Sequence, residues 1–468
     1  MSRRSRCPKK DGLSNEECIQ ESFEFVQHFS RQVVARFDGG WVSSDGGGLL
    51  LRQTDRKIRL LQRVVSGFTD RRSPWLLKHE LGEMLAQRIY GLALGYEDLN
   101  DHEQLRRDPL LGLLAGKREI DRPLAGKSTL NRMELTPAAE AAAQQRYHKI
   151  SYSPERLDAL LVDIFLEAHT TPPTQIVLDL DVTDTPLHGE QEQGFFHGYY
   201  GHYCYLPLYI FCGEHLLCAR QRPSNQDASA GAQQEVERIV HQIRRCWPQV
   251  EIILRADSGF CREELMAWCE AHQVDYVLGL ARNQRLERKI APALGQAKSA
   301  HQQTGQAARV FVELVYQTHK SWSRPRRVVA KAEYLDKGAN PRFVVTSLLT
   351  QGWAARELYE QLYCARGEME NRIKEQLSLF ADRMSTETLR ANQLRLYFSS
   401  FAYVLVQALR RLALAGTAMA KAQVSTIRLR LLKIAAQVRL SARRVWLRYP
   451  RSYPWKPLFA AAWAALRC

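Results

Sequence analysis

The sequence predicts an α/β protein: a mixed sheet with helices on both faces, interrupted by a β-rich segment and flanked by helical regions at both ends of the chain. Three patterns predict this fold class. Apolar residues recur at helical spacing from Pro74 to about Lys149. Short extended segments alternate with helix-like ones between 176 and 281. Strand-prone sequence from 284 to 350 then precedes a long helical pattern at 354–380.

The net charge of +16 is concentrated near the C-terminus. Fifteen Lys and Arg and no Asp or Glu lie between Thr388 and Cys468, so the rest of the 468 residues is close to neutral. A second basic segment, expected to be a flexible arm, opens the chain (Arg3, Arg4, Arg6, Lys9, Lys10). A polyanionic partner explains this distribution, and an ordinary solvated surface is the alternative.

Membrane attachment is a weaker explanation for the charge. The most apolar stretch, Leu396–Leu409, has about half the length needed to cross a bilayer and is expected to be a buried helix. The N-terminus MSRRSRCPKK lacks the apolar segment of a signal peptide, and the ten cysteines show no zinc-binding spacing. We therefore expect a cytoplasmic protein with reduced thiols and no membrane contact.

The N-terminal third divides into two regions. Residues 1–73 are expected to form an arm and a turn-rich segment around SSDGGGLLLR, and residues 74–150 a helical region. Basic and aromatic residues in the second region are compatible with DNA docking, and an ordinary helical lobe explains them equally well. These residues are Arg88, Arg106, Arg107, Lys117, Arg118 and Lys127, with Tyr90 and Tyr96.

Five strands are expected within residues 151–283, at 176–182, 203–211, 216–220, 251–257 and 275–281, with helices at about 228–246 and 261–272. The first three strands have connections too short for a crossover and are expected to form an antiparallel meander. The last two each follow a helix. This is the strand order of a ribonuclease-H-like sheet.

Two acids lie on one face of the first strand. In IVLDLDV, Leu178 and Leu180 alternate with Asp179 and Asp181, which places like charges about 7 Å apart. A bound cation commonly relieves such repulsion. A turn or capping role for Asp179, Asp181 or Asp184 is the alternative.

Two further acids complete the pattern. Asp257 ends the fourth strand, where a turn residue is also common, and Glu370 lies on the long helix. Tyr363, Arg366, Glu370 and Lys374 are spaced three, four and four apart and share one helix face. An exposed salt-bridge ladder is the alternative for this face.

Together these residues resemble the DDE transposases of bacterial insertion sequences, in the group named for a Tyr-Arg-Glu-Lys signature. The resemblance rests on Asp181-x-Thr183, Asp257 and Tyr363-x2-Arg366-x3-Glu370. Leu377 stands where the signature has Lys, and Lys374 is the substitute that we expect. Similar wording surrounds these residues at GYEDLNDH (95–102), KSTLNRME (127–134), HGEQE (188–192) and RPSNQDASAG (222–231).

The resemblance implies a domain plan. A ribonuclease-H-like catalytic domain would span 151–283 and 353–387, interrupted by a β-rich insertion domain at 284–352. A helical DNA-binding region at 74–150 would precede it, and a basic helical region at 388–468 would follow. The predicted activity is cleavage of DNA ends at terminal inverted repeats and transfer of the 3'-hydroxyl ends into target DNA.

Chemistry suggests how the acids act. Two Mg²⁺ ions, with Mn²⁺ as a substitute, would be bridged by Asp181, and Asp257 and Glu370 would each hold one of them. Tyr363, Arg366 and Lys374 are expected to contact DNA phosphates.

Further DNA contacts are expected in the insertion and the tail. Trp322 lies among six basic residues, and Trp322, Arg326 and Arg327 are expected to contact DNA, with the indole stacking on an unpaired base. A tryptophan packed on an arginine stem is the alternative. The tail segment QVSTIRLRLLKIAAQVRLSARRVWLR is expected to be a helix that tracks phosphates. The six residues are Lys320, Arg324, Arg326, Arg327, Lys331 and Lys337.

The expected partners are double-stranded DNA, both transposon ends and target, and a second copy in a DNA-bound dimer that holds two ends together at the bacterial nucleoid. Two other functions remain possible: a nuclease without strand transfer and a transposon-derived DNA-binding protein without catalysis. Against the nuclease, the sequence lacks at 251–257 the D/E-x-K pair that a restriction-type nuclease core would carry there.

Overall fold

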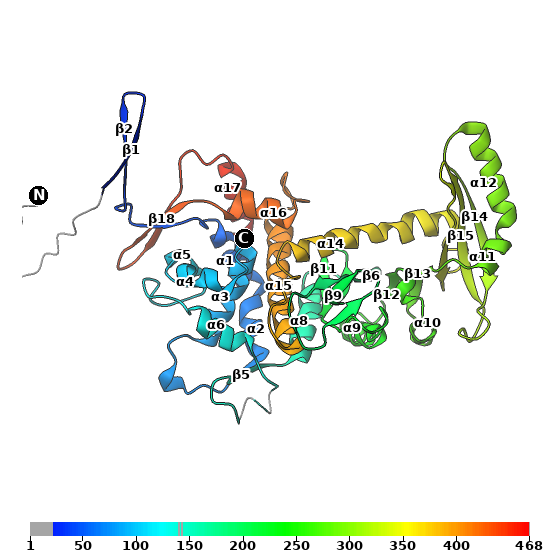
Figure 1. The fold of residues 1–468 in the computed structure, drawn as a ribbon, viewed down its shortest axis with the longest axis horizontal. Helices are drawn as coiled ribbons and strands as arrows, with labels where there is room; N and C mark the ends of the chain where they lie inside the picture. Colours follow the sequence, from blue (N-terminus) through cyan, green and yellow to red (C-terminus); the bar gives the residue numbers. More distant parts are fainter. Residues whose placement is uncertain (1–21, 139–140, 142–143, 468) are drawn as a thin grey trace, which may run out of the picture.

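The computed structural model describes residues 22–138, 141 and 144–467, and the basic arm at 3–10 lies outside these residues. A helical lobe and a large sheet lie on either side of one long helix, α15 (Leu389–Leu409) (Figure 1). Nearly every side chain of α15 is buried, which confirms the buried helix expected at Leu396–Leu409. Its hydroxyls are satisfied internally, since Ser399 and Ser400 donate to the carbonyls of Leu379 and Leu396.

The large sheet is mixed and confirms the α/β class. Its strand order is β11-β10-β6-β12-β13-β17-β15-β14. β10 is antiparallel to β6 and β11, whereas β12 is parallel to β6 and β13. The strand expected at 203–211 is divided at Pro207, which has no N–H to donate to the sheet. The strands here are β6 (Gln175–Val182), β9 (His202–Tyr205), β10 (Leu208–Cys212), β11 (His215–Arg220), β12 (Glu251–Ala256) and β13 (Asp275–Leu280).

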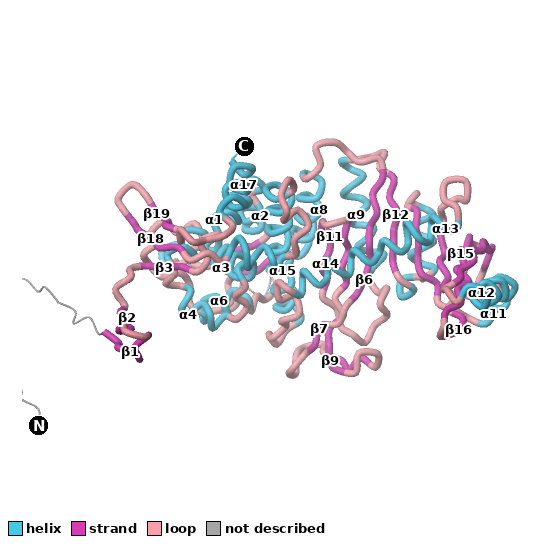
Figure 2. Tube along the Cα trace, turned by 90° about the horizontal axis from the view of Figure 1, so that it is seen from above, coloured by secondary structure: helices cyan, strands magenta, loops and turns pink. Residues whose placement is uncertain are grey.

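Helices cover both faces of this sheet. Leu178 and Leu180 belong to the core that also contains residues of α9 (Ala232–Cys246) and α10 (Glu263–Ala271). Ile253 and Val277 pack on the opposite face against the helical rod that crosses the sheet (Figures 1 and 2). The rod was expected as one regular helix at 354–380, and its winding changes along its length. It consists of α13 (Ala355–Glu357), a π-helical stretch η4 (Leu358–Tyr363), a tighter turn η5 (Cys364–Arg366) and α14 (Gly367–Leu377).

The segment 284–352, expected as an insertion domain, shares the large sheet. β17 pairs with β13 through Phe343–Thr346, so its strands extend the sheet rather than forming one of their own. Without this partner the edge of β13 would leave backbone groups unpaired. Two helices within the segment were not expected from sequence. The elements are α11 (Gln284–Lys289), α12 (Ala291–Thr304), β14 (Ala308–Tyr316), β15 (Arg326–Leu335), β16 (Gly338–Ala339) and β17 (Arg342–Thr346).

The helical lobe is closed by the C-terminal tail, which corrects the expectation of a basic helix there. Within the segment 423–448 that was expected to be one helix, only Val424–Ile427 (α16) and Arg428–Leu432 (η7) are helical. β18 (Ala436–Leu440) then pairs with β3 (Trp41–Ser43) and β19 (Val445–Arg448). Buried Ala436 and Val438 alternate with exposed neighbours, a period of two that the arginine-rich composition obscured.

The remaining elements complete the lobe and its edges. The helices are α1 (Gly48–Ile58), α2 (Leu60–Ser66), α3 (Leu81–Leu94), α4 (His102–Leu105), α5 (Pro109–Leu114), α6 (Lys127–Glu134), α8 (Pro154–Glu167) and α17 (Lys456–Arg467). The strands are β1 (Ser22–His28), β2 (Arg31–Arg36), β4 (Phe68–Asp70), β5 (Ile150–Tyr152), β7 (Thr185–Pro186) and β8 (Phe195–His197). Within the described part of the chain, no helix is long and apolar enough to cross a membrane.

Candidate active site

The sheet brings two of the predicted acids to one edge. β6 and β12 are parallel and pair Val177 with Ile253 and Asp179 with Arg255. Two residues further along each strand stand Asp181 and Asp257, at carboxyl ends that meet at the same edge. Side chains alternate along a strand, so Asp181 and Asp257 lie on the same face of the sheet as Val177 and Ile253. That face is the one covered by the helical rod.

The third acid reaches the same place from the rod. Arg366 donates from Nη1 to Oδ2 of Asp181 at 2.9 Å, and its Nη2 lies 3.6 Å from Oε1 of Glu370, one turn further along the helix. The guanidinium therefore lies between a strand-end acid and the helical acid. The ladder alternative described one of these contacts, since Arg366 and Glu370 do form an i,i+4 pair.

The charges at this site are unbalanced. Burial raises the pKa of Asp181 to about 6; Arg366 lowers it, and Asp257 and Glu370 raise it again. The side chain of Asp181 is only 14% exposed, whereas that of Glu370 is 54% exposed. Asp181 and Glu370 thus share one arginine while Asp257 adds a further negative charge nearby, and an additional cation would relieve their mutual repulsion.

The three carboxylates are suitable ligands for a hard divalent cation, although their side chains are not arranged as a metal site. Among the residues that the structure describes, no three His, Cys, Asp or Glu side chains form a group that could hold a metal ion. Arg366 contacts both Asp181 and Glu370, and an ion shared by these acids requires the guanidinium to turn away. All three acids offer oxygen, which Mg²⁺ and Mn²⁺ prefer.

Tyr363 closes one side of the site. A Cβ on Gly279 would lie 2.6 Å from its hydroxyl and 2.8 Å from the backbone nitrogen of Ser258, so only glycine fits there. Burial raises the pKa of Tyr363. Lys374 is exposed, and no ion pair joins it to another described residue.

Beside Tyr363 lies a cavity of about 300 Å³ that sequence reasoning did not identify. Arg282 and Arg342 line it together with Ser258 and Gly279. Arg282 lies two residues after the end of β13, much as Asp257 follows β12. This position at a strand end could have indicated from the sequence that Arg282 lies near the site. Arg342 comes from β17, whose place beside β13 was not visible in the sequence.

The structure corrects the expected DNA contacts of the 320–331 segment. Trp322 is 7% exposed and packs edge-on against Tyr316, with the guanidinium of Arg326 5.4 Å from its ring. Arg326 is buried and pairs with Glu263 and Glu270. This is the tryptophan-on-arginine alternative, and it leaves no indole face for a base.

Arg327 and its neighbours are likewise engaged within the protein. Arg327 pairs with Glu313 and donates to the carbonyls of Leu348 and Trp353. Arg324 and Lys331 also pair with acids. The basic composition of this segment therefore serves mainly to neutralise acids of neighbouring strands and helices.

Part of the predicted docking surface of the helical region is also internal. Arg88 and Tyr90 are buried, and Arg88 pairs with the fully buried Glu134, which also pairs with Arg395 of α15. His102 joins the same network, because its Nε2 accepts a hydrogen bond from Nη1 of Arg88 at 3.2 Å. The motifs GYEDLNDH and KSTLNRME thus supply residues that hold the lobe to α15.

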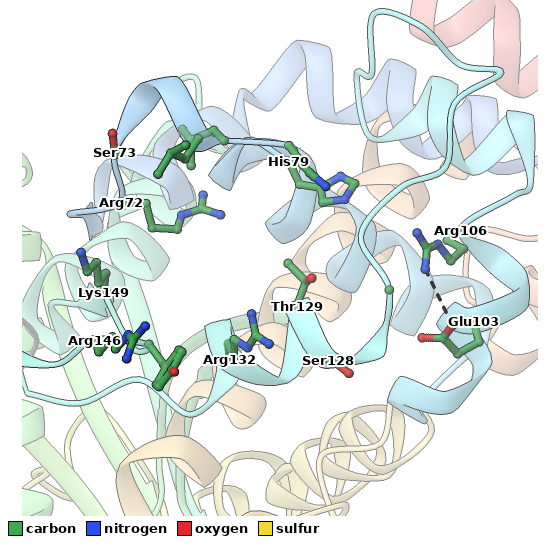
Figure 3. A pocket seen from close by; sticks show the side chains of 15 residues that line it. Arg72, Ser73, His79, Glu103, Arg106, Ser128, Thr129, Arg132, Arg146 and Lys149 are labelled. Atoms are coloured by element: carbon green, nitrogen blue, oxygen red, sulfur yellow. Dashed lines mark ion pairs between the residues drawn. The ribbon is translucent and has the colours of Figure 1, made fainter.

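A basic cavity of about 780 Å³ opens elsewhere in the helical lobe (Figure 3). Arg72 and Arg132 turn toward the same open space. Glu103 is the one acid among the lining residues, and it lies 3.8 Å from Arg106. Burial lowers the pKa of His79, and four surrounding cations lower it further, so the local potential is positive. The ionisable lining residues are Arg72, Lys78, His79, Glu103, Arg106, Arg132, Arg146 and Lys149.

The fold is therefore an α/β fold in which two acids stand at neighbouring strand ends and a third acid reaches them from a helix that crosses the sheet. Such a site suits chemistry that uses a bound cation. The sequence matches the family model described as Transposase DDE domain group 1 over residues 25–468. The chain belongs to this family of transposases, which confirms the resemblance to DDE transposases drawn from its motifs.

Other comparisons are more distant. No curated protein matches the chain by sequence. A similar solved structure is the cryo-EM structure of the piggyBac transposase synaptic complex with hairpin DNA, which is 11% identical, with 83% of this chain and 79% of that chain covered and a TM-score of 0.43.

Proposed function

We propose that this transposase binds the terminal inverted repeats of an insertion sequence, cleaves the DNA ends with two divalent metal ions, and transfers the 3'-hydroxyl ends into target DNA. Asp181, Asp257 and Glu370 are the proposed metal ligands. The observation that carries this proposal is the convergence of Asp181 and Glu370 on Arg366, with Asp257 close enough to raise the pKa of Asp181.

The metal ions, when bound, would activate a water or a 3'-hydroxyl and neutralise charge on the scissile phosphate. Mg²⁺ would serve, with Mn²⁺ as a substitute. The chain itself contributes positioning. Arg366, released from Asp181, would hold a DNA phosphate, and Tyr363 and Lys374 would contact the same backbone.

The strand order β11-β10-β6-β12-β13, with an antiparallel second strand, supports assigning this sheet to the ribonuclease-H-like class. The later strands β17, β15 and β14 would then be the element inserted before the Glu370 helix. In this interpretation the insertion extends the catalytic sheet.

Two basic surfaces support DNA binding. One is the cavity beside Tyr363 with Arg282 and Arg342, and the other is the basic cavity of the helical lobe. We propose that the first holds DNA near the cut and the second holds the terminal repeat farther along the duplex. Because two ends must be joined, the DNA-bound form is proposed to be a homodimer.

The proposal is tested with purified protein, a duplex ending in the element's terminal repeat, and MgCl₂. Nicked and joined products are expected with the wild type and absent with Asp181→Asn, Asp257→Asn and Glu370→Gln. Glu368→Gln is the matched control, because Glu368 is also exposed, lies two residues from Glu370 and does not pair with Arg366. Retained cleavage in Asp181→Asn would reject the ligand assignment.

Binding is scored separately from chemistry. If Asp181→Asn binds the terminal repeat normally and only cleavage is lost, the enzyme assignment stands. If wild-type protein binds the repeat but never cuts it, the chain is a DNA-binding protein without catalysis. Nicking without any joined product would assign it as a nuclease. Replacing Arg132 and Lys149 by Ala should flatten the salt dependence of binding by a slope of roughly two, one per lost phosphate contact.

A further inference from the structure

A buried ion pair lies directly behind the candidate active site. Arg255 donates from Nε and Nη2 to the two carboxylate oxygens of Asp179, at 2.5 and 2.8 Å. Both side chains are less than a tenth exposed. The pair joins β6 to β12 two residues before Asp181 and Asp257, so it ties together the two strands that carry these acids.

The same guanidinium also reaches the helical rod. Nη1 of Arg255 donates to the carbonyl oxygen of Leu362 at 2.5 Å. Leu362 belongs to the π-helical stretch η4, and a carbonyl oxygen has a second lone pair that can accept this additional donor. Tyr363 follows at once, and Glu370 lies about two turns further along the rod.

We propose that Asp179 and Arg255 are positioning residues, which fix the Glu370-bearing rod over the strand ends. Asp179 orients the guanidinium, and Arg255 transmits that orientation to the rod through Leu362. One planar group of β12 thereby contacts both other elements that carry the proposed ligands, β6 and the rod. This inference rests on the proposed function for its catalytic consequence, though the mechanical link is testable without metal or DNA.

The buried ion pair is not expected to contribute much to the free energy of folding by itself. Replacing a buried ion pair by apolar side chains of similar size is often neutral for folding, whereas removing one partner leaves an unpaired buried charge. The double variant Asp179→Leu/Arg255→Met therefore keeps similar side-chain volume and removes both the salt bridge between β6 and β12 and the link to Leu362, without leaving an unpaired buried charge. Arg255→Lys is a second test, because lysine donates from one nitrogen and cannot reproduce the planar fork with which Arg255 bonds the carboxylate bidentately while it also reaches the carbonyl.

The first readout is hydrogen exchange of the amides at 358–370 in metal-free protein. Both variants should exchange faster there than the wild type, at an unchanged or slightly lowered melting temperature. The matched control is Arg220→Met, which removes another arginine of the same sheet whose partners Asp158 and Glu235 lie away from the rod. It should lower the melting temperature without accelerating exchange at 358–370.

The second readout is single-turnover cleavage against Mg²⁺ concentration, with repeat binding measured in parallel without metal. Loss of positioning should lower the cleavage rate, or raise the Mg²⁺ concentration that gives the half-maximal rate, by ~10- to 100-fold. This is the usual effect of removing a residue that orients a metal ligand. Repeat affinity should stay within about twofold of wild type. Unchanged exchange, or a wild-type rate and Mg²⁺ dependence in both variants, would overturn the proposal. If the wild type does not cleave, the proposed function fails and the exchange experiment still decides the link.

Discussion

Replacing Asp181 by asparagine should stabilise the metal-free protein at neutral pH. Burial, aided by Asp257 and Glu370, raises the pKa of Asp181 from 3.8 to about 6 in the folded chain. An acid with a higher pKa in the folded than in the unfolded state binds its proton more tightly when folded. Its contribution to stability is therefore lost as the pH rises from about 4 to about 6.

The size of the effect follows from the shift. About two pKa units at ~1.4 kcal/mol each correspond to ~3 kcal/mol of destabilisation above pH 6, falling below ~1 kcal/mol near pH 4. Asparagine imitates the neutral acid and keeps an oxygen for the N–H of Val182, which lies 2.9 Å from Oδ1 of Asp181. The variant loses only the charge that Arg366 incompletely offsets.

The assay is urea unfolding of wild type and Asp181→Asn in EDTA at pH 4 and pH 7.5. The free energy of unfolding of the variant should exceed that of wild type by ~2 to 3 kcal/mol at pH 7.5 and be nearly equal at pH 4. Added Mg²⁺ should stabilise the wild type and leave the variant unchanged, which removes or reverses the difference. A variant less stable than wild type at pH 7.5 would show that the Arg366 pair outweighs burial.

Three further predictions concern other parts of the molecule. Glu134→Gln should lower the free energy of unfolding by ~3 to 5 kcal/mol, because Arg88 and Arg395 lose their shared buried partner, and a loss below ~1 kcal/mol in chemical denaturation would contradict this. Burial lowers the pKa of His102 to about 3, so the folded state resists protonation of this side chain. The free energy of unfolding should therefore fall by ~1.4 kcal/mol per pH unit below about pH 6.5, and His102→Gln should remove this pH dependence. Parallel profiles of unfolding free energy against pH for the two proteins would count against the prediction. Gly279→Ala should reduce cleavage far more than repeat binding, since the new Cβ would meet the Tyr363 hydroxyl and the Ser258 backbone; a wild-type cleavage rate would mean that the strand end yields without cost.

Local spacing rules explain what could be anticipated about the candidate site. Alternation along β6 placed Asp179 and Asp181 on one face, and a helical period placed Arg366 and Glu370 one turn apart. Each inference depends on residues within four positions of one another. The meander and the two later strands followed in the same way from short and helical connections.

Contacts between distant segments had no such local signal. Arg366 pairs with Asp181 across 185 residues, and Arg255 reaches Leu362 across 107. The burial of Trp322 depended on Tyr316 and on acids of α10, so the same basic, aromatic stretch was consistent with a DNA surface and with a packed interior.

The amino-acid sequence by itself determined the α/β class of the fold and the strand face that Asp179 and Asp181 share, because backbone periodicity is a property of neighbouring residues. Only the tertiary structure decided that β17 continues the sheet, that the basic tail turns into a hairpin on β3, and that one arginine stands among the acids. Those outcomes depend on which surfaces meet, and burial is settled by the partner that covers a residue rather than by the residue itself.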